Sequence, residues 1–224
     1  MTELDKAVKE VIHIAGDISS KIGDLVEIGL SYAPYIGNAL NYIKFKRFSK
    51  RLKEHEAKIR KIGQLASQSL LSEEYINQRI FPVVLADLIE EHEDAKVNYI
   101  LNGFQNVFIE EKSEESMVIN YFDTLRNLRY AHIRRLFYFA DLAPIYPEGF
   151  YFLGSELDAF VRSLDEQLKN LGLISFQLRV GELGGQEFDR SKDDVVIRSY
   201  GEMFIKFIMD DPQVYDDLIK LKEK

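Results

Sequence analysis

The sequence contains no cysteine. Without thiols the chain forms no disulfide, thiolate metal site or cysteine nucleophile, and this composition permits a reducing compartment. The sequence also lacks an uninterrupted apolar run of about 20 residues, the length that a membrane-spanning helix needs. Its most apolar stretch, residues 25–43, is interrupted by Glu27, Pro34 and Gly37. We therefore expect no spanning helix here, and an interfacial hairpin stays open as an alternative.

The first residues, Met1 to Lys6, are polar and acidic. Secretory signal peptides instead begin with a basic segment followed by an apolar one. This difference predicts a cytoplasmic location, with peripheral contact to the membrane as the alternative.

Composition and periodicity predict a mostly α-helical globular protein. The chain has 46% hydrophobic, 12% aromatic and 29% charged residues, and its 224 residues lie between one and two domains in length. Apolar side chains recur at helical spacing through most of the sequence. We predict a helical region over residues 1–115 and an α+β domain over residues 116–224.

Charge is unevenly distributed along the chain. The net charge is -8, yet residues 44–61 alone carry +7. From Phe45 to Ile62 apolar residues alternate in steps of three and four, which predicts an amphipathic helix over about 44–62. Its cations form either a solvated face of a bundle helix, the reading we favour, or a surface for anionic lipid or RNA. The candidate anion-binding residues are Lys46, Arg47, Lys50 and Arg51.

An acidic run, residues 90–94, lies within another predicted helix. His92 has no second histidine at the spacing that a metal site on one helix face needs. We interpret this run as a solvated acidic face and predict no metal site and no cofactor.

The last third of the chain has clear helix and strand signals. Ser155 with Asp158 forms a capping box, apolar residues follow at helical spacing, and Gly172 is a C-cap, which predicts a helix over 155–171. Strict alternation predicts a strand over 174–180, and a second short strand covers 195–197. A helix follows over 200–208, and a short C-terminal helix follows Pro212.

This order of elements resembles the winged-helix arrangement over residues 117–209. The resemblance rests on Leu171-Gly172-Leu173-Ile174 before the hairpin and on Ser199-Tyr200-Gly201, which stands where Thr-x-x-Gly is usual. It implies a winged-helix-like domain with a small β-hairpin. Acids outnumber bases on the helix over 155–171 and on the hairpin, so we expect this domain to bind a protein and not DNA.

More loosely, the whole chain resembles uncharacterised helical proteins of bacterial prophages and mobile elements, some of the abortive-infection or phage-defence type. The residues that carry this resemblance are Ala33-Pro34-Tyr35-Ile36-Gly37, the helix over 91–101, and Leu125-x-x-Leu128-x-x-x-His132. The resemblance implies a setting and no particular activity.

One enzymatic pattern is present. The run from Arg126 to His132 resembles the R-x(4-6)-H motif of HEPN ribonucleases, in which the arginine and the histidine act at the scissile phosphate of RNA. However, His132 lies four residues after Leu128 and four before Leu136, on the stripe that faces the predicted core. We interpret His132 as structural and keep catalysis as the alternative.

We therefore expect a non-enzymatic protein-interaction or regulatory protein, whose partner is another protein or a second copy of the chain. One alternative is a HEPN-like ribonuclease using Arg126 and His132. A second alternative is a membrane-perturbing effector acting through residues 10–62.

We predict that a fragment over about 117–224 gives no mobility shift with duplex DNA at low salt, because its would-be recognition helix and wing are net acidic. An electrophoretic mobility assay measures this. Submicromolar, salt-dependent binding would reverse the interpretation of the domain.

Overall fold

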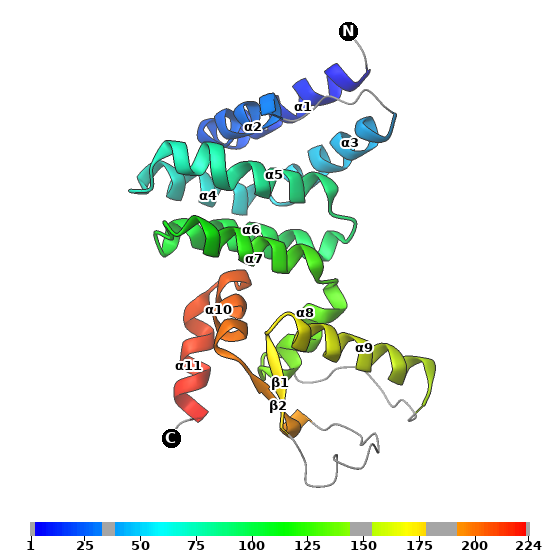
Figure 1. Ribbon diagram of the computed structural model, residues 1–224. Helices are drawn as coiled ribbons and strands as arrows, with labels where there is room; N and C mark the ends of the chain where they lie inside the picture. The colour runs from blue at the N-terminus through cyan, green and yellow to red at the C-terminus, as the bar shows by residue number, and fades with distance from the viewer. Residues whose placement is uncertain (1–2, 33–38, 144–153, 178–191, 223–224) are drawn as a thin grey trace. The chain divides into compact units, whose positions relative to one another are not determined.

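The computed structural model describes residues 3–32, 39–143, 154–177 and 192–222. Within these ranges the chain forms eleven α-helices and one antiparallel pair of short strands, so the prediction of a mostly helical protein with a small hairpin is confirmed (Figure 1). The chain divides into two compact units, Met1–Arg126 (unit 1) and Asn127–Lys224 (unit 2). This division falls at the last residue of the helix Glu115–Asn127, later than the boundary expected from the sequence.

Unit 1 is a stack of helices. Its elements are α1 (Glu3–Ile18), α2 (Ser20–Tyr32), α3 (Ala39–Glu54), α4 (Glu56–Gln68), the π-helix η1 (Tyr75–Ile80), α5 (Phe81–Glu90), α6 (Asp94–Ile109) and α7 (Glu115–Asn127). Helix α1 packs on α2 and α3. Helices α2 and α3 both contact α5, and α6 packs on α4 and α5. Apolar residues from all of these helices are buried between them, among them Val11, Leu25, Phe48, Ile62, Phe81 and Phe104.

The predicted basic amphipathic helix is two helices that meet at a bend. Helices α3 and α4 join at His55, whose N–H still donates to the Arg51 carbonyl, at 3.0 Å. The predicted stripe is buried on both sides of the bend, with Phe48 and Ile62 each 1% exposed. The periodicity was therefore right about the buried face and wrong about one straight helix.

One glycine, Gly23, allows α2 to approach α1 closely. A Cβ placed on Gly23 would lie 2.8 Å from the Cα of Gly16, closer than side-chain carbons approach a backbone. A Cβ on Gly16 would meet no atom within 4 Å. Of this pair, only Gly23 is therefore required by the close approach of the two helices.

A π-turn carries the chain past Pro82. Ser72 Oγ accepts the Tyr75 N–H at 3.2 Å, and the Phe81 N–H then donates to the carbonyl of Ile76. Proline has no N–H, and its ring would clash with the carbonyl four residues earlier in a regular α-helix. The wider π-turn relieves this conflict, so α5 begins directly at Phe81.

Unit 2 contains α8 (Tyr130–Phe139), α9 (Glu156–Asn170), β1 (Ile174–Phe176), the 3-10 helix η3 (Lys192–Asp194), β2 (Val195–Ile197), α10 (Ser199–Ile208) and α11 (Pro212–Lys222). The two strands pair antiparallel, with Ile174 opposite Ile197. The last residues of the predicted first strand, 178–180, lie outside the described residues. The helix predicted over 155–171 is confirmed as α9.

Both ends of α9 are capped, and the acid of the predicted capping box binds the N–H one residue before Ser155. Ser155 Oγ accepts the Asp158 N–H at 3.1 Å, and the Asp158 carboxylate accepts the Gly154 N–H at 2.8 Å. Gly172 follows the helix with a φ of 74°, the left-handed conformation that favours glycine. Further on, a Cβ on Gly201 would overlap the Leu173 carbonyl oxygen, so α10 requires glycine there.

We predict that Gly23→Ala and Gly16→Ala have opposite effects on stability. The first forces α1 and α2 apart and lowers the free energy of unfolding by about 1 to 3 kcal/mol. The second adds a methyl group in open space and raises it by about 0.5 to 1 kcal/mol, since alanine favours helix over glycine. Urea denaturation followed by circular dichroism measures both values. A stabilising Gly23→Ala would contradict the close approach.

Candidate functional site

The basic and acidic runs of the sequence face each other. Lys44, Arg47 and Arg51 lie along one face of α3, and this face meets the junction where α5 ends at Glu90 and α6 begins at Asp94. Lys44 pairs with Glu90 at 2.6 Å. The prediction of one helix through residues 90–94 is wrong, because 91–93 lie between α5 and α6, whereas Glu90, His92 and Asp94 are exposed as expected.

Arg51 is at the centre of this junction and is 2% exposed. Its guanidinium donates to the Leu88 carbonyl at 2.7 Å, to the Glu91 carbonyl at 2.8 Å and to Asp94 Oδ1 at 2.7 Å. The carbonyls at the end of a helix have no partner within that helix and carry partial negative charge. Arg51 therefore closes the end of α5 and holds the start of α6 with one planar group.

Two neighbouring ion pairs complete the junction. Glu91 accepts the backbone N–H groups of His92 and Glu93 at 2.7 and 2.9 Å, and it pairs with Lys96 at 2.6 Å. Burial alone would raise the pKa of Glu91, but these hydrogen bonds together lower it. The hydrogen bond from Arg51 lowers the pKa of Asp94. Both carboxylates are therefore held in the ionised form.

Arg126 belongs to the same group of charges. Its Nε donates to Asp87 at 2.6 Å, and its Nη1 donates to Asp123 at 2.7 Å. Burial raises the pKa of Asp87, and the contact with Arg126 acts in the opposite direction. We name the group the α5–α6 charge cluster; its members are Arg47, Arg51, Asp87, Glu91, Asp94, Lys96, Asp123 and Arg126. Cations and carboxylates are equal in number, so the cluster neutralises itself.

This arrangement corrects the predicted anion-binding set. Arg51 is buried and cannot reach a membrane or RNA, and Arg47 is half-buried with its Nη1 directed to the Glu91 carbonyl at 3.3 Å. Lys46 and Lys50 remain exposed, at 45% and 68%, with carboxylate partners Glu10 and Glu54. Of the four candidate residues only the two lysines remain exposed. The surface of α3 therefore carries less positive charge than the sequence predicted.

The candidate ribonuclease residues are both engaged in structural contacts. His132 is 5% exposed, and its Nδ1 accepts the N–H of Arg129 at 3.0 Å, which caps the start of α8. Arg126 makes the two ion pairs described above. Arg126 is the last residue of unit 1, and His132 lies in unit 2. These contacts weigh against a role for either side chain at a phosphate.

Unit 2 has a buried ion pair that the sequence did not reveal. Arg135 on α8 donates to both carboxylate oxygens of Asp165 on α9, at 2.7 and 2.9 Å, and each side chain is 6% exposed. The guanidinium also lies 4.4 Å from the ring centre of Phe139. Asp165 is one of the acids on the helix over 155–171 that we expected to repel DNA, but its charge is neutralised by Arg135. In the sequence, the position of Asp165 beside Leu164, at the edge of the apolar stripe, is the only indication that it is buried.

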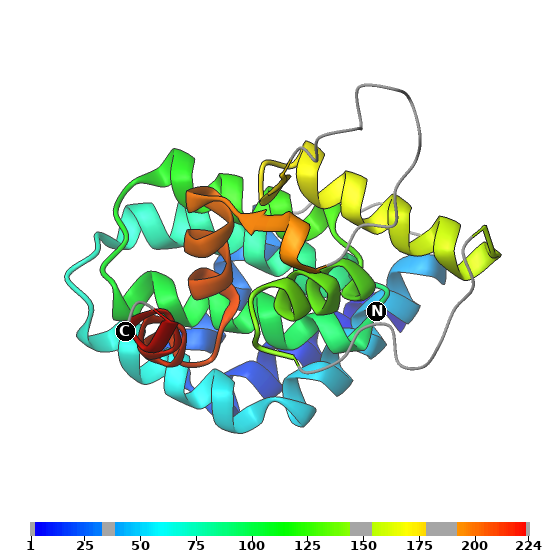
Figure 2. The same ribbon diagram turned by 90° about the horizontal axis from the view of Figure 1, so that it is seen from below.

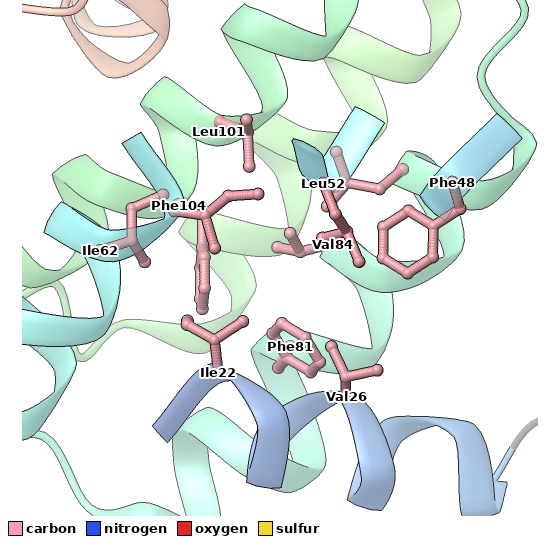
Figure 3. A pocket seen from close by; sticks show the side chains of 11 residues that line it. Ile22, Val26, Phe48, Leu52, Ile62, Phe81, Val84, Leu101 and Phe104 are labelled. Atoms are coloured by element: carbon pink, nitrogen blue, oxygen red, sulfur yellow. The ribbon is translucent and has the colours of Figure 1, made fainter. Parts of the chain in front are cut away.

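The cavity drawn in Figure 3 is a packing void in the core of unit 1. It measures about 20 Å³ and is enclosed by apolar side chains of α2 to α6, among them Val26, Phe48, Val84 and Phe104 (Figure 3). A volume of this size accepts at most one water, and an apolar wall gives that water no partner. The described residues also contain no cluster of three or more metal-binding side chains.

The segment proposed for membrane disruption is occupied by core packing. Most apolar residues of α1 to α4 are buried, and Ile22, Leu25 and Leu52 are at most 4% exposed. Among the described helices none is long and apolar enough to cross a membrane. Comparison of the chain with protein-family models, curated protein sequences and solved structures finds no significant match.

We predict that Arg51→Ala lowers the free energy of unfolding by about 2 to 4 kcal/mol, because it leaves buried carbonyls without a donor. The matched control is Lys50→Ala on the exposed face of α3, which changes stability by about 0.5 kcal/mol or less. Equal urea midpoints for the two variants would contradict the structural role of Arg51.

Proposed function

We propose that this chain is a non-enzymatic protein-interaction or regulatory protein that binds a partner protein through α9. The observation that carries the proposal is an apolar pair at the start of that helix, Leu157 and Phe160, which are 42% and 47% exposed. Large apolar side chains that lie together on a surface are typical of protein-binding sites.

The pair continues the buried stripe of α9 beyond the core. Val161, Leu164 and Leu168 are at most 2% exposed, and Leu157 and Phe160 extend the same face toward the beginning of the helix. Fully burying one such side chain contributes about 1.5 to 3 kcal/mol, so the pair is sufficient to anchor a helix or a groove of a partner.

The surroundings of the pair suit a protein better than a nucleic acid. Glu156 is exposed beside Leu157, while the cation Arg162 pairs with Asp158 at 3.1 Å. In this proposal the helix, the hairpin and α10 form a winged-helix-like scaffold that presents α9 to a protein. The proposed setting is the cytoplasm of a bacterium that carries a prophage or mobile element, with a role in phage defence.

The two alternatives receive less support from the contacts. A ribonuclease would need Arg126 and His132 at a phosphate, and a membrane effector would need the apolar residues of α1 to α4 at a lipid surface. No described contact favours either arrangement.

The test compares two double variants of the tagged full-length chain in pull-down from the native host, read by mass spectrometry. Replacing Leu157 and Phe160 with Ala should abolish capture of the partner. The control replaces Val214 and Leu221, which are 52% and 70% exposed on α11, with Ala and should leave capture unchanged. Equal capture by both double variants would exclude α9 as the binding surface.

A second assay separates the interaction protein from the ribonuclease. Purified chain is incubated with mixed RNA in the absence of metal, beside folded Arg126→Ala and His132→Ala variants. We expect no cleavage by any of them. Cleavage by the wild type that both folded variants lose would replace the proposal with the HEPN-like enzyme.

A further inference from the structure

We propose that unit 1 self-associates head to tail. In this contact a leucine at one end of unit 1 meets the lysine face of α3 in a second copy of the chain. This inference goes beyond the proposed function, because it uses residues of unit 1 only and does not involve α9.

Leu70 is an exposed leucine on a backbone that is held in place. Its side chain is 93% exposed. Its N–H donates to Glu111 Oε1 at 3.3 Å, and the hydroxyl of Ser69 donates to Glu111 Oε2 at 3.1 Å. Tyr75 further ties the two loops together through a hydrogen bond to the Lys112 carbonyl at 2.8 Å. An ordered backbone reduces the entropy that a contact at Leu70 would cost.

The surroundings of Leu70 are acidic, although Glu73, Glu110 and Glu115 pair with Lys21, Lys112 and Arg79. The two loops and their flanks, residues 69–75 and 109–117, contain six glutamates and one lysine. Five of these glutamates are exposed, namely Glu73, Glu74, Glu110, Glu111 and Glu114. Ile109 adds a second apolar side chain, 46% exposed. We name this surface, residues 69–75 and 109–117, the acidic end.

The opposite pattern is found on α3. Ile43 is 58% exposed, and Lys46, Lys50 and Lys53 follow it at three, seven and ten residues, which places all four on one side of the helix. Lys50 is 68% exposed, and no described residue forms an ion pair with Lys53. We name these four residues the lysine face. It presents an apolar residue among cations, as the acidic end presents one among anions.

The two surfaces cannot meet within one copy. Figures 1 and 2 show the start of α3 on the side of unit 1 opposite to the loops that join α4 to η1 and α6 to α7. A contact between them therefore joins two molecules and is heterologous. Repetition of a heterologous contact that does not close produces open chains of subunits.

Charge complementarity is the reason for choosing a second copy as the occupant. One molecule carries both halves of the contact, a leucine beside exposed glutamates and an isoleucine at the start of a row of exposed lysines. Exposed ion pairs are individually weak and are screened by salt. The association is therefore expected at high protein concentration and low ionic strength.

The first experiment measures the mass of the full-length chain by sedimentation equilibrium over roughly a hundredfold range of concentration. The wild type should increase in mass beyond a dimer at low salt and return to the monomer at about 0.5 M salt. Leu70→Ala should raise the apparent Kd at least tenfold. The matched control Leu221→Ala, another exposed leucine, should leave the Kd unchanged. A monomeric wild type at every concentration would overturn the inference.

The second experiment exchanges charges. One variant carries Glu74→Lys and Glu114→Lys at the acidic end, and the other carries Lys50→Glu and Lys53→Glu on the lysine face. Each variant alone should remain monomeric, because like charges then meet. Mixed in equal amounts they should associate, since the intact acidic end of the second meets the intact lysine face of the first. Monomers in the mixture would overturn the head-to-tail contact.

The two proposals fail separately in these tests. Loss of partner capture in the Leu157 and Phe160 double variant with unchanged sedimentation affects only α9. A chain that remains monomeric but still captures its partner through α9 refutes self-association and leaves the proposed function intact.

Discussion

The buried guanidinium of Arg51 fixes how three helices of unit 1 meet. It belongs to α3, is buried, and donates to carbonyls at the end of α5 and to a carboxylate at the start of α6. The chain between α5 and α6 can reverse in three residues because these groups have partners there. A lysine could offer only one point charge at this place, whereas arginine offers a planar set of donors. The course of α6, and with it the core beneath α4, depends on this group.

Unit 2 also contains a buried arginine that joins two helices. Arg135 and Asp165 join α8 to α9 through two parallel hydrogen bonds, and an aromatic ring covers the cation. Buried pairs of this kind add little stability compared with apolar residues of equal size, yet losing one partner leaves an uncompensated charge. We infer that they mainly select one register of the two helices.

The sequence predicted the helices well and the roles of the charges poorly, for one physical reason. Periodicity and caps are local, so α9, its cap at Ser155 and the buried stripe of α3 and α4 could be predicted directly. The partner of a charge is not local: Arg51 contacts Asp94, which lies far along the chain. Taken separately, the basic residues 44–61 and the acidic residues 90–94 therefore predict two solvated faces, and Arg51 is expected at the surface. The burial of His132 could be predicted because its neighbours at helical spacing are apolar.

The π-turn over Tyr75–Ile80 has a consequence for the buried stripe. Such a turn holds one residue more than an α-helix of the same rise, so the segment behaves as a one-residue insertion. Ile76 and Ile80 within it and Val84 and Leu88 after it follow at steps of four residues and are all buried. The turn therefore lets the buried stripe continue at four-residue steps from η1 into α5, so Pro82 is accommodated without moving these apolar residues out of the core.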